Sequence, residues 1–216
     1  MNIRFYNARI LTETMNITEG ELWVRGNTIC YIGDGEADSA DCKAPGDVIL
    51  CDRESDVKRN LLMPGFKNAH THSAMTFLRS MADDLPLQEW LNEQVFPNEA
   101  KLKGEEAYIF AKIAIMEYLT SGISSAFDMY IYPKEVIQAC VDCGFRIVQV
   151  SGLNNFTSSL EELEEQYVTY NDYHELCSYK LGFHAEYTTD KKLLEGLAGL
   201  SEKYHAPVYT HNSETK

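Results

Sequence analysis

The sequence lacks the features that would indicate a membrane protein or a nucleic-acid-binding protein. No run of about 18 apolar residues is present, and the N-terminal segment has no apolar core of the kind found in signal peptides. Lys and Arg total 19 against 33 Asp and Glu, for a net charge of −14, and basic residues are nowhere concentrated into a patch that could neutralise phosphates. We therefore expect a cytoplasmic protein with no membrane or nucleic-acid partner.

The cysteine and glycine patterns exclude two further classes. The six cysteines are scattered along 216 residues, so they imply free thiols rather than a disulfide framework. Cys140 and Cys143 form a C-x-x-C, but no second pair would complete a zinc site, and we interpret them as packing thiols. No Gly-x-Gly-x-x-Gly follows a predicted strand, which disfavours a doubly wound nucleotide-binding domain.

The pattern of predicted strands and helices divides the chain into two parts near residue 62. Residues 1–62 predict a small β unit with strands over 3–11, 21–24, 28–32 and 48–51, a turn at Gly26-Asn27 and a loop over 33–46. From residue 63 onward, predicted strands (65–69, 123–127, 145–150, 179–183, 207–210) alternate with predicted helices (86–95, 104–120, 133–143, 158–176, 190–204). This alternation predicts an α/β fold with a parallel sheet, either doubly wound or a (β/α)8 barrel interrupted after its fifth strand.

Polar residues follow the predicted strands, where both architectures place their chemistry. They are, in strand order, His70 and His72, Asp128, Ser151, His184 and His211. Four of the six histidines in the chain occupy these positions. For Asp128 and Ser151 we prefer a structural interpretation, a polar group that ties down a loop.

The histidines have the spacing of a metal site. His70 and His72 project to the same side of an extended segment, so both can reach one ion. Neutral imidazole is a good ligand for Zn2+ or Fe2+, and a catalytic site needs about three protein ligands and an open position. His211 would be the third ligand. Glu214, three residues further on, either transfers protons for an activated water or caps a helix start, and the sequence weighs these two roles about equally.

Several segments together resemble the amidohydrolase superfamily, and within it the S-adenosylhomocysteine and 5'-methylthioadenosine deaminase and chlorohydrolase group. They are Leu62-Met-Pro-Gly-Phe-Lys-Asn-Ala-His-Thr-His, Ala74 to Leu91, Phe96-Pro-Asn-Glu, Phe127-Asp-Met-Tyr, Gly182-Phe-His-Ala-Glu-Tyr-Thr and Pro207-Val-Tyr-Thr-His-Asn-Ser-Glu-Thr.

The resemblance implies a role for each candidate residue. By it, His70, His72 and His211 bind one divalent metal, most simply Zn2+ with Fe2+ as the alternative, and Glu214 is the catalytic proton shuttle. Glu99 would hydrogen-bond ribose hydroxyls, and His184 would face the substrate. Trp90 could form a wall of the pocket, although a tryptophan on an apolar helix face is more often a core residue.

The resemblance also implies a reaction and an architecture. The reaction is hydrolytic deamination of a purine nucleoside or another aminated heterocycle by metal-activated water, although Phe183 and Glu186 stand where nucleoside deaminases usually have Pro. Residues 1–62 would begin a composite β-sandwich, and 63–216 would be strands one to five of a barrel. We expect an N-terminal fragment that is inactive by itself and forms homo-oligomers. The rival hypothesis is a non-enzymatic metal- or ligand-binding α/β module.

Overall fold

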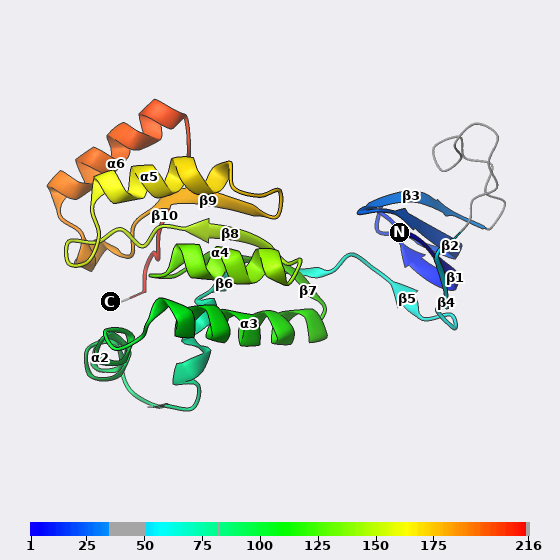
Figure 1. Cartoon of the computed structure of the whole chain (residues 1–216), viewed down its shortest axis with the longest axis horizontal. Coiled ribbons are helices and arrows are strands. Elements are labelled where there is room, and N and C mark those ends of the chain that lie inside the picture. Colours follow the sequence, from blue (N-terminus) through cyan, green and yellow to red (C-terminus); the bar gives the residue numbers. More distant parts are fainter. Residues whose placement is uncertain (35–50, 82, 215–216) are drawn as a thin grey trace. The chain divides into compact units, whose positions relative to one another are not determined.

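The computed structural model describes residues 1–34, 51–81 and 83–214, and the chain forms two units, Met1–Pro64 and Gly65–Lys216 (Figure 1). The first unit is one sheet with strand order β3-β2-β1-β4, in which β5 also pairs with β1. Its strands are β1 (Asn2–Leu11), β2 (Ile17–Arg25), β3 (Thr28–Gly33), β4 (Arg53–Asp56) and β5 (Leu61–Leu62). β1, β2 and β3 are antiparallel neighbours, whereas β4 and β5 run parallel to β1.

Three predicted strands and one turn of this unit are confirmed. The strands at 3–11, 21–24 and 28–32 lie within β1, β2 and β3, and Gly26 turns the chain between β2 and β3 with φ of 62°. The prediction of a strand at 48–51 lies outside the described residues apart from Cys51, which is not in a strand, and most of the predicted loop at 33–46 also lies outside them. β4 was not predicted, because Arg-Glu-Ser-Asp has no apolar alternation.

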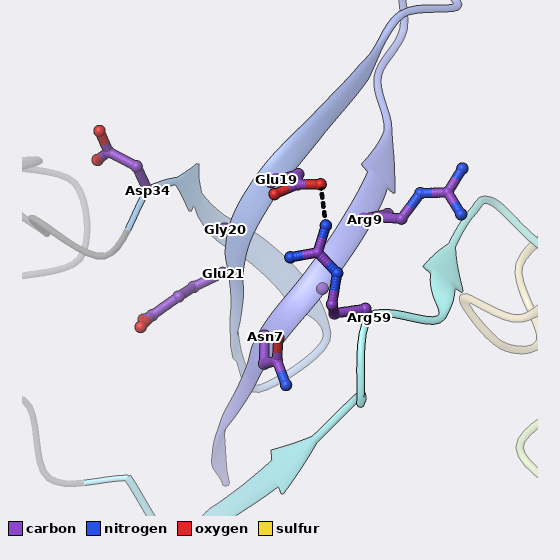
Figure 2. A pocket seen from close by; sticks show the side chains of 8 residues that line it. Asn7, Arg9, Glu19, Gly20, Glu21, Asp34 and Arg59 are labelled. Carbon is purple, nitrogen blue, oxygen red and sulfur yellow. Dashed lines mark hydrogen bonds and ion pairs between the residues drawn. The ribbon is translucent and has the colours of Figure 1, made fainter.

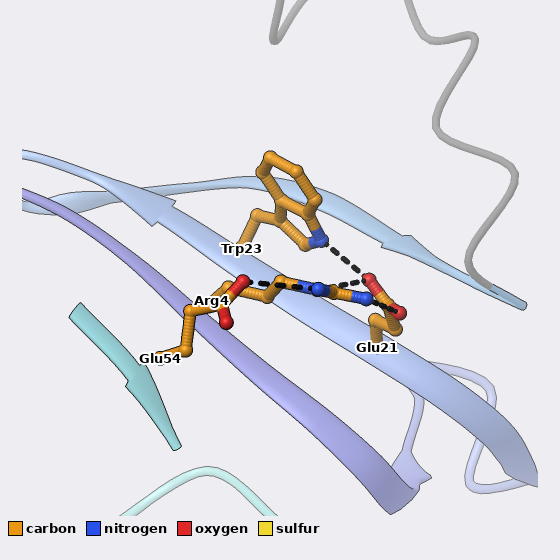
Figure 3. Close-up of polar contacts among 4 residues, drawn as sticks. All are labelled: Arg4, Glu21, Trp23 and Glu54. Carbon is orange, nitrogen blue, oxygen red and sulfur yellow. Dashed lines mark hydrogen bonds and ion pairs between the residues drawn. The ribbon is translucent and has the colours of Figure 1, made fainter. Parts of the chain in front are cut away.

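A partly buried network of ion pairs joins three strands of this sheet (Figure 3). The Arg4 guanidinium on β1 donates to both carboxylate oxygens of Glu21 on β2, with Nε 2.8 Å from Oε2, and to Glu54 on β4 at 3.0 Å. Trp23 Nε1 donates to the same Glu21 at 2.9 Å. Glu21 is only 8% exposed, and the bonds from Arg4 lower its pKa below the ordinary value of 4.5. A carboxylate at this depth is stable because its oxygens are paired.

A polar depression of about 310 Å³ lies on the same unit (Figure 2). Its lining includes Asn7, Arg9 and Asp34, together with an ion pair in which Arg59 Nη2 lies 2.6 Å from Glu19 Oε1. None of the predicted site residues lines it.

The cysteines mostly follow the prediction. Cys51, Cys140, Cys143 and Cys177 are free thiols, and burial raises the pKa of the Cys140 thiol. The prediction was wrong for Cys30, which is disulfide-bonded. Six scattered cysteines give no signal for a single pair, because a disulfide requires two Cβ atoms about 3.8 Å apart, and only the fold sets that distance.

The second unit is built on a parallel sheet whose spatial order, β10-β9-β8-β7-β6, is the order of its strands along the chain. The strands are β6 (Phe66–Thr71), β7 (Ile123–Met129), β8 (Arg146–Val150), β9 (Cys177–Gly182) and β10 (Val208–Tyr209). A doubly wound sheet reverses direction at a switch point, whereas each strand here adds to the same edge. The doubly wound alternative is therefore wrong for the described strands, and the curled sheet has the arrangement of a half-barrel.

Helices connect the strands and cover one face of this sheet. They are α1 (Leu87–Glu89), the π-helix η2 (Trp90–Val95), α2 (Phe96–Glu99), α3 (Gly104–Thr120), α4 (Pro133–Asp142), α5 (Leu160–Asn171) and α6 (Lys191–Tyr204), with short 3-10 segments η1 (Ser73–Leu78) and η3 (Glu186–Thr188). α3 matches its predicted bounds. α6 begins after Asp190, whose side chain accepts from Leu193 N at 2.8 Å, as the cap prediction required. The core between helices and sheet includes Val136, Ile137, Ile147 and Leu181.

The predicted helix over 158–176 is too long. α5 ends at Asn171, and the side chain of this residue pairs with the backbone of β9, donating to Tyr179 O at 2.9 Å and accepting from Tyr179 N at 3.0 Å. These bonds hold the end of α5 against β9. Among the described residues, no helix is both long and apolar enough to cross a membrane.

Candidate metal site

Three histidines from the two outer strands of the sheet meet at its carboxyl end. His70 lies in β6 and His72 follows it, with their Nε2 atoms 3.3 Å apart. His211 follows β10, and its ring centroid lies 5.0 Å from that of His70 and 5.2 Å from that of His72. One ligand nitrogen from each of the three lies within 4.8 Å of the others. Residues 141 positions apart in the sequence therefore form one cluster.

Backbone carbonyls orient two of these rings. Nδ1 of His72 lies 2.7 Å from Met129 O, and Nδ1 of His211 lies 2.8 Å from His184 O. A carbonyl only accepts, so each Nδ1 carries the proton and each Nε2 keeps a free lone pair. Burial, more than any other factor, lowers the pKa of His72 to about 4, so this ring is neutral at pH 7. Neutral imidazole with a carbonyl behind Nδ1 is the usual form of a metal ligand.

The donor set fits a divalent cation such as Zn2+. Two nitrogens bound tetrahedrally at about 2.0–2.1 Å lie roughly 3.3–3.4 Å apart, and His70 Nε2 lies 3.3 Å from His72 Nε2. Within the described parts of the chain, no other group of three His, Cys, Asp or Glu residues has this closeness.

His184 lies beside the cluster without being one of the three convergent ligands. Its ring centroid is 5.3 Å from that of His211, and its Nδ1 lies 3.2 Å from Thr188 Oγ1. Burial lowers the pKa of His184 below its ordinary value. Its carbonyl orients His211, so the end of β9 contributes a backbone group as well as a side chain.

Glu214 shares a small cavity with His211. The cavity, of about 30 Å³, is also lined by Tyr187, and Tyr187 Oη donates to Glu214 Oε2 at 2.9 Å. A helix that begins after Glu214 would lie outside the described residues, so the alternative that Glu214 caps a helix start stays a prediction. The Glu214 carboxylate therefore lies beside His211, close to the cluster of three histidines.

Glu99 and Trp90 lie on the segment between β6 and α3. Glu99 is half-buried, and burial raises the pKa of its carboxyl group, an effect partly offset by Tyr130. Trp90 is half-buried and packs against a small cluster formed by Leu78, Leu91 and Val95. In the part of the chain that the structure describes, no ring contact or hydrogen bond joins Glu99 or Trp90 to the three histidines.

The two polar residues given a structural interpretation do hold loops. Asp128 is fully buried and its Oδ1 accepts from Ser73 N at 3.1 Å; burial raises its pKa to about 7. Ser151 Oγ accepts from Leu153 N at 3.1 Å. No sequence signal pointed to Met129 O or Tyr187, because a backbone carbonyl has no residue identity and Tyr187 has the pattern of an ordinary aromatic residue.

Comparison with known proteins establishes the family. Residues 61–216 match the model of the Amidohydrolase family, and the chain belongs to that family. It is 31% identical to the 5-methylthioadenosine/S-adenosylhomocysteine deaminase of Thermoanaerobacter pseudethanolicus over the whole of this chain and 50% of that protein. It is 34% identical to the 5'-deoxyadenosine deaminase of Methanothermobacter thermautotrophicus, over 93% of this chain and 46% of the relative. The resemblance that the sequence motifs indicated is confirmed.

Solved structures agree. An adenosine deaminase from Xanthomonas campestris with bound zinc superposes with a TM-score of 0.85 at 26% identity, covering 99% of this chain and 49% of that one. A guanine deaminase from C. acetobutylicum with bound guanine superposes with a TM-score of 0.81 at 20% identity, over 100% of this chain and 54% of that one, and shows the fold alone. The chain thus spans about half the length of the relatives it matches.

Proposed function

We propose that this chain supplies strands one to five of a (β/α)8 barrel in a hydrolytic deaminase, with His70, His72 and His211 binding one divalent metal, Zn2+ before Fe2+. The convergence of these three imidazoles at one end of the sheet is the observation that carries the proposal. A bound divalent cation supplies activated water at neutral pH. The first unit would be the N-terminal part of a composite β-sandwich.

Glu214 is the proposed proton shuttle. Its carboxylate accepts the proton of the attacking water and passes it to the amine nitrogen, so that a C–O bond forms, the C–N bond breaks and ammonia leaves. Tyr187 holds one carboxylate oxygen at 2.9 Å, which leaves the other for proton transfer. His184 would contact the substrate at the same rim, and Glu99 would accept from substrate hydroxyls. Trp90 would form part of the pocket wall.

The substrate class that we propose is a small aminated heterocycle, with adenosine derivatives first. The relatives that cover nearly all of this chain are named as deaminases of 5-methylthioadenosine, S-adenosylhomocysteine and 5'-deoxyadenosine. Phe183 and Glu186 beside His184 are the positions where the pocket would differ. A cytoplasmic location, a homo-oligomer and the absence of nucleic-acid and membrane partners stay predictions. Family membership does not favour the rival hypothesis of a non-enzymatic module.

The test is ammonia release from aminated purines, pyrimidines and triazines. It is measured on the protein translated from the whole reading frame that contains this sequence, and on the 216-residue chain alone. We expect Glu214→Gln to lower turnover about 10²–10⁴-fold with Zn2+ content unchanged. The matched control is Glu202→Gln, which alters an exposed glutamate on α6. Release of no ammonia by the full product, or equal turnover in Glu214→Gln and the control, would refute the proposal.

A further inference from the structure

Two side chains, those of Tyr118 and Asp128, hydrogen-bond to the residues on both sides of His72. The Tyr118 hydroxyl on α3 lies 2.5 Å from Thr71 Oγ1 and 3.2 Å from Ser73 Oγ. Asp128 on β7 accepts from the N–H of Ser73 at 3.1 Å. Residues 71 and 73 are thus fixed by side chains, while the ring of His72 between them is fixed by Met129 O.

The hydroxyl contacts of Tyr118 lie on the opposite side of β6 from the histidine ligands. Side chains alternate along a strand, so Thr71 points away from His70 and His72, and its contact with Tyr118 places it on the side of α3. Thr71 pairs in register with Asp128, which pairs with Gln149 on β8. Thr71, Asp128 and Gln149 are therefore register neighbours on three adjacent strands, and none of them is among the three convergent histidine ligands.

Apolar packing would not require polar groups at these positions. Asp128 is 0% exposed, and removing a carboxylate from water is costly unless its hydrogen bonds are replaced. The bond that the structure gives it is to the residue immediately after His72. The two hydroxyl contacts of Tyr118 flank the same residue.

We infer that Asp128 and Tyr118 are positioning residues for the metal ligand His72, holding residues 71 and 73 so that Nε2 of His72 faces His70 and His211. The inference rests on the proposed metal function. Groups that orient a ligand from behind typically change metal affinity 10–100-fold when they are removed. Asp128 and Tyr118 act through the backbone of His72 and touch neither the metal nor the substrate.

The test measures the affinity of this chain for Co2+ and the visible absorption of the bound Co2+. The dissociation constant is calculated from the concentration of folded protein in each variant. We expect Asp128→Leu to weaken binding about 10–100-fold and to change the absorption. Asp128→Asn should bind within about threefold of the wild type, because its amide oxygen can still accept from Ser73 N. Gln149→Leu is the matched control, since Gln149 is equally buried, is the register neighbour of Asp128 and makes no bond to residues 71–73.

The possible results separate the two ideas. Absence of Co2+ binding by the wild type would overturn the metal site and this inference together. Binding by the wild type, with Asp128→Leu as tight as Gln149→Leu, would overturn the inference alone. If Asp128→Leu does not fold, Tyr118→Phe decides: about tenfold weaker binding supports the inference, and unchanged affinity with an unchanged spectrum overturns it.

Discussion

Zn2+ should raise the melting temperature of one unit of this protein and leave the other unchanged. The three convergent histidines all lie in Gly65–Lys216, so binding stabilises that unit only. At a free Zn2+ concentration of 100 times Kd, the stabilisation is about 2.7 kcal/mol. For a unit of this size, each kcal/mol raises Tm by about 2–4 °C, which gives an expected shift of about 5–11 °C.

Removing one ligand should abolish most of this shift. If His211→Ala raises Kd about 100-fold, the same Zn2+ concentration stabilises by only about 0.4 kcal/mol, or roughly 1–2 °C. The control is His205→Asn, which alters an exposed histidine outside the cluster. His205 has a φ of 50°, a backbone conformation that asparagine tolerates.

Differential scanning calorimetry with and without Zn2+ measures both transitions in one experiment. The transition of Met1–Pro64 serves as an internal reference, because its temperature should not depend on Zn2+. A shift of equal size in His211→Ala and His205→Asn would show that Zn2+ does not bind at the three histidines. The geometry described above would then have no functional meaning.

Three further predictions concern stability. The pKa of Glu21 is lowered by Arg4, so its stabilisation is present above pH 4.5 and is lost as pH falls through the lower folded-state value; acid titration monitored by circular dichroism should show this step, and Glu21→Gln should remove it. Asp190→Ala should destabilise by about 0.5–2 kcal/mol in urea because α6 loses its cap, whereas Asp190→Ser should have a much smaller effect. Ile137→Ala, at a fully buried position, should cost about 2–5 kcal/mol and Ile137→Val about 0.5–1.5 kcal/mol; equal effects would contradict close packing there.

Local chemistry made much of the second unit predictable. The apolar face of 104–120 gave α3 its bounds, and Asp190 marked the start of α6 because its carboxylate accepts a backbone N–H of the first turn. The boundary of α5 was missed because it depends on bonds between Asn171 and Tyr179 across a loop. β4 was missed because it pairs through its backbone and carries polar side chains.

The sequence by itself determined that the side chains of His70 and His72 lie on the same side of the chain, since residues two apart in an extended segment point the same way. It also set the alternation of strands and helices that puts His211 at the same edge of the sheet. Only the tertiary structure decided that the ligand atoms of these three histidines lie within 4.8 Å of one another. It alone showed that Met129 O and His184 O set the tautomers of His72 and His211 and that Tyr118 and Asp128 hold the segment around His72. These contacts join residues 27 to 57 positions apart, and the backbone path that brings them together is a property of the packed sheet.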